Sequence, residues 1–503
     1  MIHHDDARRR QALAALETQV DKELTLLDYP ARVWIAPAQT DESDTANTLY
    51  NVAIVGAGQA GLAIAFGLRR MGIEGVLVLD SLPAGYEGPW ENYARMETLR
   101  TPKNLTGPDL GLPSLTFRAW YEAQYGEAAW QALGKIPKGM WMDYLRWYRQ
   151  LLALPVRNNA AVQRIVPPDP AGDGALTLQL ASGESLRARR VVWATGMEGD
   201  GCWSIPDFIR QALPTSHYAH TAQAIDFSAL RGKRIAVLGA GASAFDNAAT
   251  ALEHGAQAVH LCFRRAELPR VNPYRWMEFT GFLQHHADLS DSERWAFAKH
   301  IVDLNQPPPQ ETFVRTAKHA GFQLHPACRW QALHYDGQDI RIAVEKVGKL
   351  AGDAPDYSLE VDFVIVGTGF AIDLSRRPEL QAFAAHIARW ADRYQPPAAL
   401  ADGRLAEFPY LGEHFEWLER DPGSAPYLRH IYDFTFGALP SMGLSGASIS
   451  GLRFAVPRLL RGIAKSFYLE QSQQFYQALR DYDEPELTAD VSASIYQPAD
   501  LVS

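Results

Sequence analysis

The sequence predicts an α/β fold that contains two Rossmann-like dinucleotide-binding domains. Two stretches lead to this prediction, 51–72 (NVAIVGAGQAGLAIAFGLRRMG) and 234–255 (RIAVLGAGASAFDNAATALEHG). Each has the pattern of an apolar strand, a glycine-rich turn and a helix of small residues, and each is followed by a second strand, at 76–80 and 258–265. Because this unit occurs twice, we expect two nucleotide sites in one chain.

The length and composition of the chain restrict the class of protein. Its 503 residues suggest two or three domains, and its 47% hydrophobic and 21% charged residues are typical of a globular protein. The formal net charge of -10 argues against a nucleic-acid partner, because phosphate binding requires a basic face. Cys202, Cys262 and Cys328 lie 60 and 66 residues apart and form no CxxC pair, so we expect no disulfide framework and a cytoplasmic location.

Residues 1–50 are expected to form a helical N-terminal extension. An amphipathic pattern runs from about Asp5 to Leu27, and a loop continues through 41–44. Charges recur throughout this segment, so it is not a secretory signal, and the chain is not expected to contact a membrane. We expect the extension to pack on the main body, with a role as a lid or in a homo-oligomer as the alternative.

The first glycine-rich turn comes directly after a strand and opens a helix. Gly56 allows the tight turn, and Gly58, next to Gln59, lets the backbone approach a pyrophosphate. Gly61 permits close packing of the helix on the strand. Asp80 ends the next strand 19 residues after Gly61, where a carboxylate can accept both ribose hydroxyls. These five residues are therefore predicted to bind a dinucleotide, and their place at the start of the catalytic body predicts FAD.

The second glycine-rich turn has the same pattern, with alanine in the third glycine position. The residues expected to contact its nucleotide are Gly239, Gly241, Ser243 and Ala244. No acid ends the strand that follows. Arg264 and Arg265 stand at almost the equivalent place, where guanidinium groups suit a 2′-phosphate on the ribose. The second unit is therefore predicted to bind NADPH, and two sites of this kind suggest a flavin and a nicotinamide held face to face.

Two further strands end in a Thr-Gly turn. They are RRVVWATGM (189–197) and DFVIVGTGF (362–370), and the second contains Thr368 and Gly369. The segment between the two units that contains Trp90 is rich in Trp, Tyr and Pro. Loop-rich regions of this kind commonly enclose a substrate or a cofactor ring, and Trp90 is the aromatic residue for which we expect such a contact.

With these motifs the chain resembles the class B flavoprotein monooxygenases, the superfamily of flavin-containing, N-hydroxylating and Baeyer–Villiger monooxygenases. The resemblance covers about residues 50–470. DFVIVGTGF is similar to the return strand of the family, with Gly367 in place of the usual alanine, and Gly88-Pro89-Trp90 resembles the segment that runs beside the flavin. The resemblance implies an NADPH-binding domain inserted in the FAD-binding domain. The expected boundaries are 1–50 for the extension, 51–197 and 362–470 for the FAD-binding domain, 198–361 for the NADPH-binding domain and 471–503 for a C-terminal tail.

Two departures from the family pattern concern the candidate catalytic residues. The family usually carries F-x-G-x-x-x-H before the second turn, and the corresponding run 214–220 keeps only His220, which the resemblance implies orients the linker and the nicotinamide. Flavin-containing monooxygenases carry an asparagine near the reactive flavin carbon, where this chain has Arg100, followed by Lys103. We expect Arg100 or Lys103 to offer a charged donor to the flavin peroxide or to an acidic substrate. A structural role is the alternative for all three residues.

The resemblance implies an FAD- and NADPH-dependent monooxygenase that forms a flavin C4a-(hydro)peroxide and oxygenates a small organic molecule with O2. N-hydroxylation of an amine or amino acid is the reaction that the altered run 214–220 favours. Baeyer–Villiger oxidation of a ketone is one alternative, and a flavoprotein NADPH reductase without oxygenation is another. A disulfide reductase is excluded because no CxxC follows the first turn. The histidines have no carboxylate or cysteine at the spacing that metal ligands usually show, so no metal site is expected.

Overall fold

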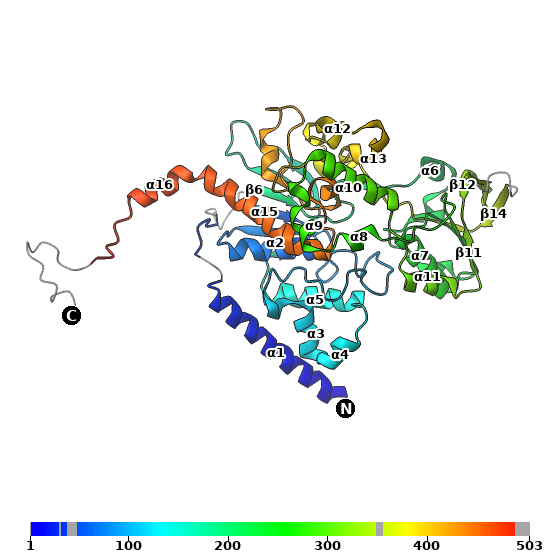
Figure 1. Cartoon of the computed structure of the whole chain (residues 1–503), viewed down its shortest axis with the longest axis horizontal. Helices are drawn as coiled ribbons and strands as arrows, with labels where there is room; N and C mark the ends of the chain where they lie inside the picture. The colour runs from blue at the N-terminus through cyan, green and yellow to red at the C-terminus, as the bar shows by residue number, and fades with distance from the viewer. Residues whose placement is uncertain (1, 30–31, 38–47, 349–355, 488–503) are drawn as a thin grey trace, which may run out of the picture.

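The computed structural model describes residues 2–29, 32–37, 48–348 and 356–487. The predicted loop at 41–44 and residues 488–503 of the predicted tail lie outside these residues. Figure 1 shows a larger part of the molecule in the centre of the view and a smaller part at the right. Each part contains its own parallel strands, so the predicted mixed α/β class with parallel sheets is confirmed.

The larger part is built on a seven-stranded sheet. Its strands are β1 Leu49–Val55, β2 Val76–Leu79, β3 Val156–Arg157, β4 Val162–Val166, β5 Leu176–Leu180, β6 Ser185–Trp193 and β17 Ile431–Asp433. The order is β3-β2-β1-β6-β5-β4, with β17 also paired to β6. The pairs β4–β5 and β5–β6 are antiparallel, and the other neighbours are parallel. The apolar residues of β1 and β2 are mostly buried, as is typical of central parallel strands.

The smaller part contains a five-stranded parallel sheet and a three-stranded antiparallel sheet. The parallel strands are β8 Tyr218–His220, β9 Arg234–Leu238, β10 Ala258–Cys262, β11 Phe322–His325 and β15 Phe363–Val366, and the antiparallel ones are β12 Cys328–Tyr335, β13 Ile340–Lys346 and β14 Tyr357–Val361. The parallel sheet has the order β11-β10-β9-β15-β8. The two glycine-rich turns therefore follow β1 in one sheet and β9 in the other, each an inner strand.

The chain crosses between the two parts twice, along segments that pair with each other. It leaves the larger sheet after β6 and comes back, after β15 of the smaller sheet, to β17. The outward segment contains β7 (Gly201–Trp203), the returning one contains β16 (Phe370–Ile372), and these strands are antiparallel partners. A Cβ at Gly201 would lie 1.8 Å from the carbonyl oxygen of Ala371, so the two crossings are tightly packed.

Helices pack on both sheets and between the two parts. Those of the larger part are α2 Gln59–Arg70, α3 Phe117–Tyr125, α4 Glu127–Ala132, α5 Lys138–Leu151, α12 Trp390–Arg393, α13 Gly403–Ala406, α14 Leu439–Met442, α15 Ile449–Glu470 and α16 Ser472–Arg480, and those of the smaller part are α6 Asp207–Ala212, α7 Ala242–Glu253 and α11 Gln310–Ala317. A further group comprises α8 Pro273–Trp276, α9 Thr280–His285 and α10 Asp291–Leu304. This group lies within the range expected for the second domain but packs on the larger part, where Trp295 contacts Trp390 at 5.7 Å between ring centroids.

The amino-terminal helix α1 (Ile2–Leu26) packs on the larger part beside α3. The indole Nε1 of Trp147 donates to Oε1 of Glu17 at 3.0 Å, and the hydroxyl of Ser114 donates to Oε1 of Glu23 at 2.6 Å. These contacts place the extension on the main body, which is the arrangement expected for a terminal segment. Figure 1 shows α1 in dark blue along the lower edge of the larger part.

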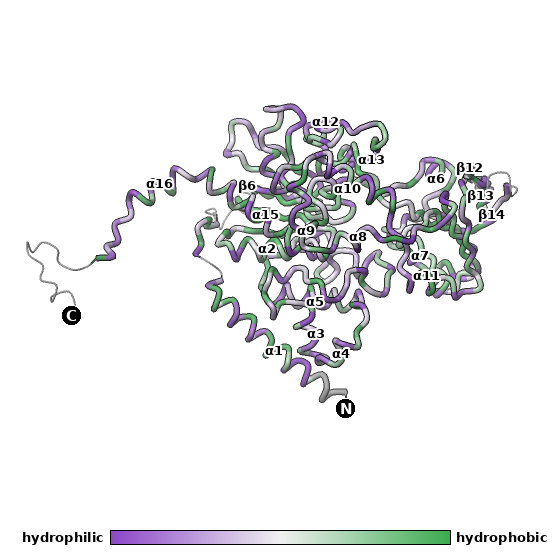
Figure 2. The backbone as a smooth tube through the Cα atoms, viewed as in Figure 1, coloured by the Kyte–Doolittle hydropathy of each residue, from purple (hydrophilic) through white to green (hydrophobic). Residues whose placement is uncertain are grey.

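The two carboxyl-terminal helices differ in burial. α15 contacts α2, and its residues Leu452, Val456 and Leu459 are fully buried. α16 points away from the body of the molecule (Figure 1) and carries mainly hydrophilic residues (Figure 2). No helix within the described ranges is both long enough and apolar enough to cross a membrane.

Candidate active site

A cavity of about 680 Å³ joins the two glycine-rich turns. The larger part lines it with Gly56, Gly58 and Gln59 of the first turn. The smaller part lines it with Ser243 and Asn247, which lie on α7 directly after the second turn. The two nucleotide-type units therefore open into one shared space.

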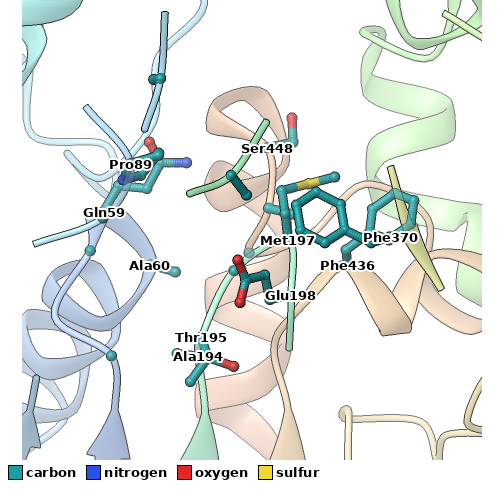
Figure 3. Close-up of a pocket in the computed structure, with 18 of the residues that line it drawn as sticks. Gln59, Ala60, Pro89, Ala194, Thr195, Met197, Glu198, Phe370, Phe436 and Ser448 are labelled. Carbon is teal, nitrogen blue, oxygen red and sulfur yellow. The ribbon is translucent and has the colours of Figure 1, made fainter. Parts of the chain in front are cut away.

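Apolar side chains form the wall of this cavity across from the first turn. Figure 3 shows Met197, Phe370 and Phe436 gathered on one side and Gln59 on the other. The carboxylate of Glu198 also lines the cavity. A largely apolar wall with a few polar groups suits a planar organic ligand, because the wall packs on the ring and the polar groups orient it.

The first turn leaves space where a phosphate would lie. Gly56 has φ +107°, and a Cβ there would lie 2.5 Å from the carbonyl oxygen of Ala194. A Cβ at Gly61 would lie 1.9 Å from the carbonyl oxygen of Gly56, so α2 starts in close contact with the turn. Beside Gly58 the nearest heavy atom is the Cα of Gly88, at 4.0 Å. Packing therefore requires Gly56 and Gly61, whereas the space beside Gly58 belongs to the cavity.

Asp80 follows β2 and joins the first turn to the next loop. Its Oδ2 accepts a hydrogen bond from the N–H of Ala57 at 2.8 Å, and its Oδ1 accepts one from the N–H of Leu82 at 2.9 Å. Burial raises the pKa of Asp80, and the two backbone N–H groups oppose that shift. The carboxyl group lies at the cavity beside the turn, the place where a ribose contact is predicted.

The loop-rich segment brings Trp90 and Arg100 to the cavity. Trp90 is buried against Trp141, with 6.5 Å between ring centroids, and Nζ of Lys138 donates to its carbonyl oxygen at 2.8 Å. Nη2 of Arg100 donates to Oδ2 of Asp246 on α7 at 2.9 Å. Arg100 therefore links the larger part to the smaller one at the edge of the cavity.

The other two candidate catalytic residues are not among those that line the cavity. The ammonium group of Lys103 lies 4.8 Å from the ring centroid of Trp130 and donates to the carbonyl oxygen of the same residue. His220 is fully buried, with Nε2 donating to the carbonyl of Gly369 at 2.9 Å and Nδ1 accepting from the N–H of Ala222 at 3.2 Å. Burial lowers the pKa of His220 to about 4, so the ring is neutral.

The second turn is packed tightly against the returning strand. Gly239 has φ +128°, and a Cβ there would lie 2.2 Å from the carbonyl oxygen of Gly367. A Cβ at Gly367 would lie 2.8 Å from the Cβ of Ala244, which explains why glycine stands where the family usually has alanine. No described heavy atom lies within 4 Å of a Cβ built at Gly241. As in the first turn, the middle glycine is the one with open space.

Several residues predicted to contact the second nucleotide lie beyond the cavity lining. Arg264 and Arg265 are exposed after β10, and Arg265 donates to the carbonyl oxygens of Asp303 at 2.9 Å and Leu304 at 3.2 Å. The hydroxyl of Thr368 donates to a carbonyl of the outward crossing segment. The arginines thus lie at the outer end of the second unit, and Thr368 joins the two crossings.

Several buried polar atoms on cavity-lining residues have no hydrogen-bond partner in the described part of the chain. They are Gln59 Oε1, Trp90 Nε1, Arg100 Nε, Thr195 Oγ1, Asn247 Oδ1, Arg377 Nε and Glu379 Oε2. Buried polar groups of folded proteins are nearly always paired. Together with the open space beside Gly58, these atoms fit a bound dinucleotide, which carries many hydrogen-bonding groups.

Several polar residues that line the cavity were not predicted from the sequence. They include Glu198, Asn272, Tyr274, Arg275, Glu278 and Arg377. The side chain of Asn272 accepts from the N–H of Tyr274 at 3.1 Å and so caps α8, which places this group at the cavity. Burial raises the pKa of Glu278. The Asn-Pro pair at 272–273 is a turn signal that could have located the start of α8, but no pattern connects it to the nucleotide turns.

Two buried carboxyl groups, Asp200 and Asp433, lie where the outward crossing leaves the larger sheet. They are hydrogen bonded to each other. Thr435 donates from Oγ1 to Oδ2 of Asp200 at 2.9 Å and from its N–H to Oδ1 of Asp433 at 2.9 Å. Burial raises the pKa of both groups, and the nearby charge of Asp200 raises that of Asp433 further. Asp433 is therefore the partner that keeps its proton.

The fold is shared with solved hydroxylase and monooxygenase structures. The family described as pyridine nucleotide-disulphide oxidoreductase matches residues 53–298. The reduced form of ornithine hydroxylase (PvdA) from Pseudomonas aeruginosa has a TM-score of 0.64 at 17% identity and covers 83% of this chain and 99% of its own. L-lysine 6-monooxygenase from Pseudomonas syringae has a TM-score of 0.61 at 16% identity, with the same coverage of 83% and 99%.

A further relative is similar over nearly the whole chain. The FAD-dependent urate hydroxylase of Xanthomonas campestris pv. campestris is 45% identical over 477 residues, which are 94% of this chain and 97% of the relative. The chain therefore belongs to the family of this FAD-dependent urate hydroxylase. The resemblance to the class B flavoprotein monooxygenases that the motifs predicted is confirmed. The chain is accordingly an enzyme of the FAD-dependent oxidoreductase or monooxygenase type.

Proposed function

We propose that the protein is an NADPH-dependent FAD monooxygenase that hydroxylates urate or a closely related planar purine. The observation that carries the proposal is the cavity, because it joins the turn after β1 to the helix after β9. Hydride transfer requires a nicotinamide ring and a flavin ring to face each other in one enclosed space. A single cavity that reaches both nucleotide-type turns supplies such a space.

In this proposal FAD binds to the larger part. The N–H groups at the start of α2, beside Gly58, receive the pyrophosphate, and Asp80 accepts hydrogen bonds from the ribose. Gln59 and Trp90 offer their unpaired side-chain atoms to the remainder of the cofactor. When bound, FAD supplies the two-electron chemistry that links a nicotinamide to O2. The side chains around it orient the substrate and keep water away.

NADPH binds to the smaller part, which we propose is a domain at 198–361 inserted in the FAD-binding domain. The N–H groups beside Gly241 and Ser243 receive its pyrophosphate at the start of α7. Arg264 and Arg265 bind the 2′-phosphate, because planar guanidinium groups match phosphate oxygens in charge and geometry. Ser243, Asp246 and Asn247 of α7 line the shared cavity, so the nicotinamide end can reach the flavin.

Urate is the proposed substrate because of the relative that is 45% identical over 94% of the chain. The cavity chemistry supports a planar purine: Phe370 and Phe436 pack on a ring, while Glu198 and Arg377 exchange hydrogen bonds with ring N–H and C=O groups. One oxygen atom of O2 enters the substrate and the other leaves as water. NADPH supplies a hydride and the solvent supplies a proton, so the atoms and electrons balance.

The three candidate catalytic residues serve this site in different ways. Arg100 lines the cavity and, through Asp246, holds the smaller part against it. Lys103 is a positioning residue, because its bond to the carbonyl of Trp130 fixes the loop that carries Arg100. His220 is a positioning residue for the crossing segments, which it joins as a neutral ring.

N-hydroxylation of an amine is the second candidate. Glu198 and Glu278 both line the cavity, and carboxylates there can bind the ammonium group of an amine or amino acid. Burial raises the pKa of Glu278, which reduces its negative charge and weakens it as a partner of a cation. The purine therefore remains the first choice.

The test is a substrate panel with the purified holoenzyme. NADPH oxidation, O2 uptake and free H2O2 are measured with urate, xanthine, ornithine, lysine and a cyclic ketone, and products are identified by mass spectrometry. We expect urate to raise NADPH oxidation and to yield a hydroxylated purine with little free H2O2. Xanthine is the matched control, since it lacks only the C8 oxygen. An oxygenated amine or ketone would replace the substrate proposal, and NADPH oxidation that yields only H2O2 with every compound would contradict it.

A further inference from the structure

Two cysteines that lie 66 residues apart in the sequence meet in the smaller part. Cys262 ends β10 and Cys328 begins β12. Both side chains are fully buried in one apolar cluster. The Cys328 thiol donates to the carbonyl oxygen of His325 at 3.2 Å, and the Cys262 thiol is hydrogen bonded to Cys328. The N–H of Cys328 donates to the carbonyl oxygen of Phe263 at 2.9 Å, so the two backbones lie side by side here. We call Cys262 and Cys328 the thiol pair.

The thiol pair adjoins the arginine turn, which is Arg264–Arg265. The N–H of Phe263 donates to the carbonyl oxygen of His325 at 3.1 Å, and the N–H of Ala327 donates to that of Arg265 at 2.8 Å. With the bond from Cys328, three backbone hydrogen bonds hold the turn against the segment before β12. The backbone segments that carry the two sulfurs are therefore hydrogen bonded to each other at the arginine turn.

We propose that the thiol pair is an oxidation site that closes to a disulfide when hydrogen peroxide accumulates, and that closure weakens NADPH binding at the arginine turn. The new bond joins Sγ of Cys262 to Sγ of Cys328, and each sulfur loses one hydrogen. One H2O2 takes up the two electrons and two protons and becomes two molecules of water. The first water leaves as one sulfur becomes a sulfenic acid, and the second leaves as the other sulfur displaces it.

Cys328 is the sulfur that reacts first. The hydrogen bond from the Cys262 thiol lowers the pKa of Cys328, and the charge of Lys346 lowers it as well. The same hydrogen bond raises the pKa of Cys262, because it holds the proton in place. The thiolate is the nucleophile in thiol oxidation, so the group with the lower pKa attacks the peroxide. A metal is not needed at this place, and no cluster in the described residues is arranged to hold one.

The oxidant follows from the reaction that the protein is proposed to catalyse. Reduced flavoenzyme that meets O2 without oxygenating a substrate releases H2O2. Formation of the disulfide fixes the arginine turn, so Arg264 cannot move to contact the 2′-phosphate. NADPH then binds less well, and fewer electrons reach the flavin. The effect on NADPH rests on the proposed function, whereas formation of the disulfide rests only on the two thiols.

The experiment exposes the holoenzyme to H2O2 and counts its free thiols after denaturation. We expect two of the three thiols to disappear over roughly minutes to hours, because buried sulfurs react only during local opening. Peptide mapping should recover a peptide that joins Cys262 to Cys328, and dithiothreitol should restore both thiols. Cys202→Ser is the matched control, and it should leave the loss of the other two thiols unchanged.

Cys328→Ala removes the thiol pair at small cost, since a buried cysteine packs as a small apolar side chain. The KM for NADPH of the wild type should rise by about threefold after peroxide and return with dithiothreitol, whereas that of the variant should stay constant. Cys262→Ala provides the same comparison if the first variant does not fold. A wild-type protein without the joined peptide would overturn the disulfide. A disulfide with an unchanged KM would overturn the link to NADPH, and an enzyme that oxidises no NADPH would instead contradict the proposed function.

Discussion

Arg100 and Asp246 form an ion pair across the boundary between the two parts of the molecule, with 2.9 Å between Nη2 and Oδ2. Asp246 lies on α7, directly after the second glycine-rich turn, and its side chain is 3% exposed. Thr312 donates to its other oxygen at 3.1 Å. Burial raises the pKa of Asp246, and the charge of Arg100 opposes that shift. The pair therefore couples the loop beside the first site to the helix of the second.

Replacement of Arg100 by alanine should lower the stability of the protein and the coupling of NADPH oxidation to substrate oxygenation. The carboxyl group of Asp246 would lose its closest cation while buried, and a hydrogen bond to a charged group is worth about 1–3 kcal/mol. We expect a free energy of unfolding lower by that amount and a severalfold rise in free H2O2 per NADPH consumed. Denaturant titration and a peroxide assay with the proposed substrate measure the two effects.

Arg118→Ala is the control for this change, because Arg118 forms an exposed pair with Glu122 within one helix. The double variant Arg100→Ala/Asp246→Ala tests the pair itself. If Arg100 acts through Asp246, the double variant should lose less stability than the two single losses added together. Additive losses would show that the two residues act independently.

The middle and last glycines of the first turn should respond differently to alanine. Gly58→Ala adds a methyl group where the nearest heavy atom is 4.0 Å away, so the melting temperature should be unchanged while FAD binds about tenfold more weakly. Gly61→Ala places a methyl group 1.9 Å from a backbone oxygen and should cost about 3 kcal/mol of stability. Thermal unfolding and flavin content after gel filtration separate the two. Equal loss of stability in both variants would contradict the assignment of the open space to the cofactor.

Arg264 should decide the choice between NADPH and NADH. The Arg264→Ala variant removes an exposed guanidinium from the proposed 2′-phosphate position, so we expect the KM for NADPH to rise about tenfold and the KM for NADH to stay constant. Steady-state kinetics with both nucleotides provides the measurement. Arg270→Ala, which removes another exposed arginine after β10, is the control. A similar rise for both nucleotides would place the 2′-phosphate elsewhere.

Local patterns account for the parts of the fold and site that could be predicted. Gly56, Gly61 and Asp80 follow strands at fixed spacings, and their geometry follows from backbone contacts within one unit. The partner of Arg100 could not be predicted, because Asp246 is 146 residues away and only the packing of the two parts brings it there. The same reason applies to Cys262 and Cys328, whose thiols meet although their spacing suggested no pairing.

The packing of α8, α9 and α10 is a further feature that local patterns do not contain. These helices lie in the range expected for the second domain, but apolar contacts such as that of Trp295 with Trp390 attach them to the larger part. A helical pattern shows which residues are apolar, yet it does not show which surface they cover. The cavity residues on α8 were missed for this reason.

The buried pair Asp200 and Asp433 should make stability fall as the pH rises. A carboxyl group whose pKa is raised on folding holds its proton more tightly in the folded state than in the unfolded chain. The stabilisation that this pair provides is therefore fully present below the ordinary aspartate pKa. It is lost progressively as the pH rises towards the raised pKa. Asp433→Asn supplies a neutral amide in place of the protonated acid, and its oxygen can still accept from Thr435.

We expect the melting temperature of the Asp433→Asn variant to decline less than that of the wild type between about pH 5 and about pH 9, and to exceed it at the alkaline end. Scanning calorimetry at several pH values measures both curves. Asp169→Asn, a change at an exposed carboxyl group in a turn, is the control and should follow the wild type. Only a proton held by the pair makes the two proteins respond differently to alkali. Parallel curves of melting temperature against pH for the Asp433→Asn variant and the wild type would therefore show that the pair holds no proton at neutral pH.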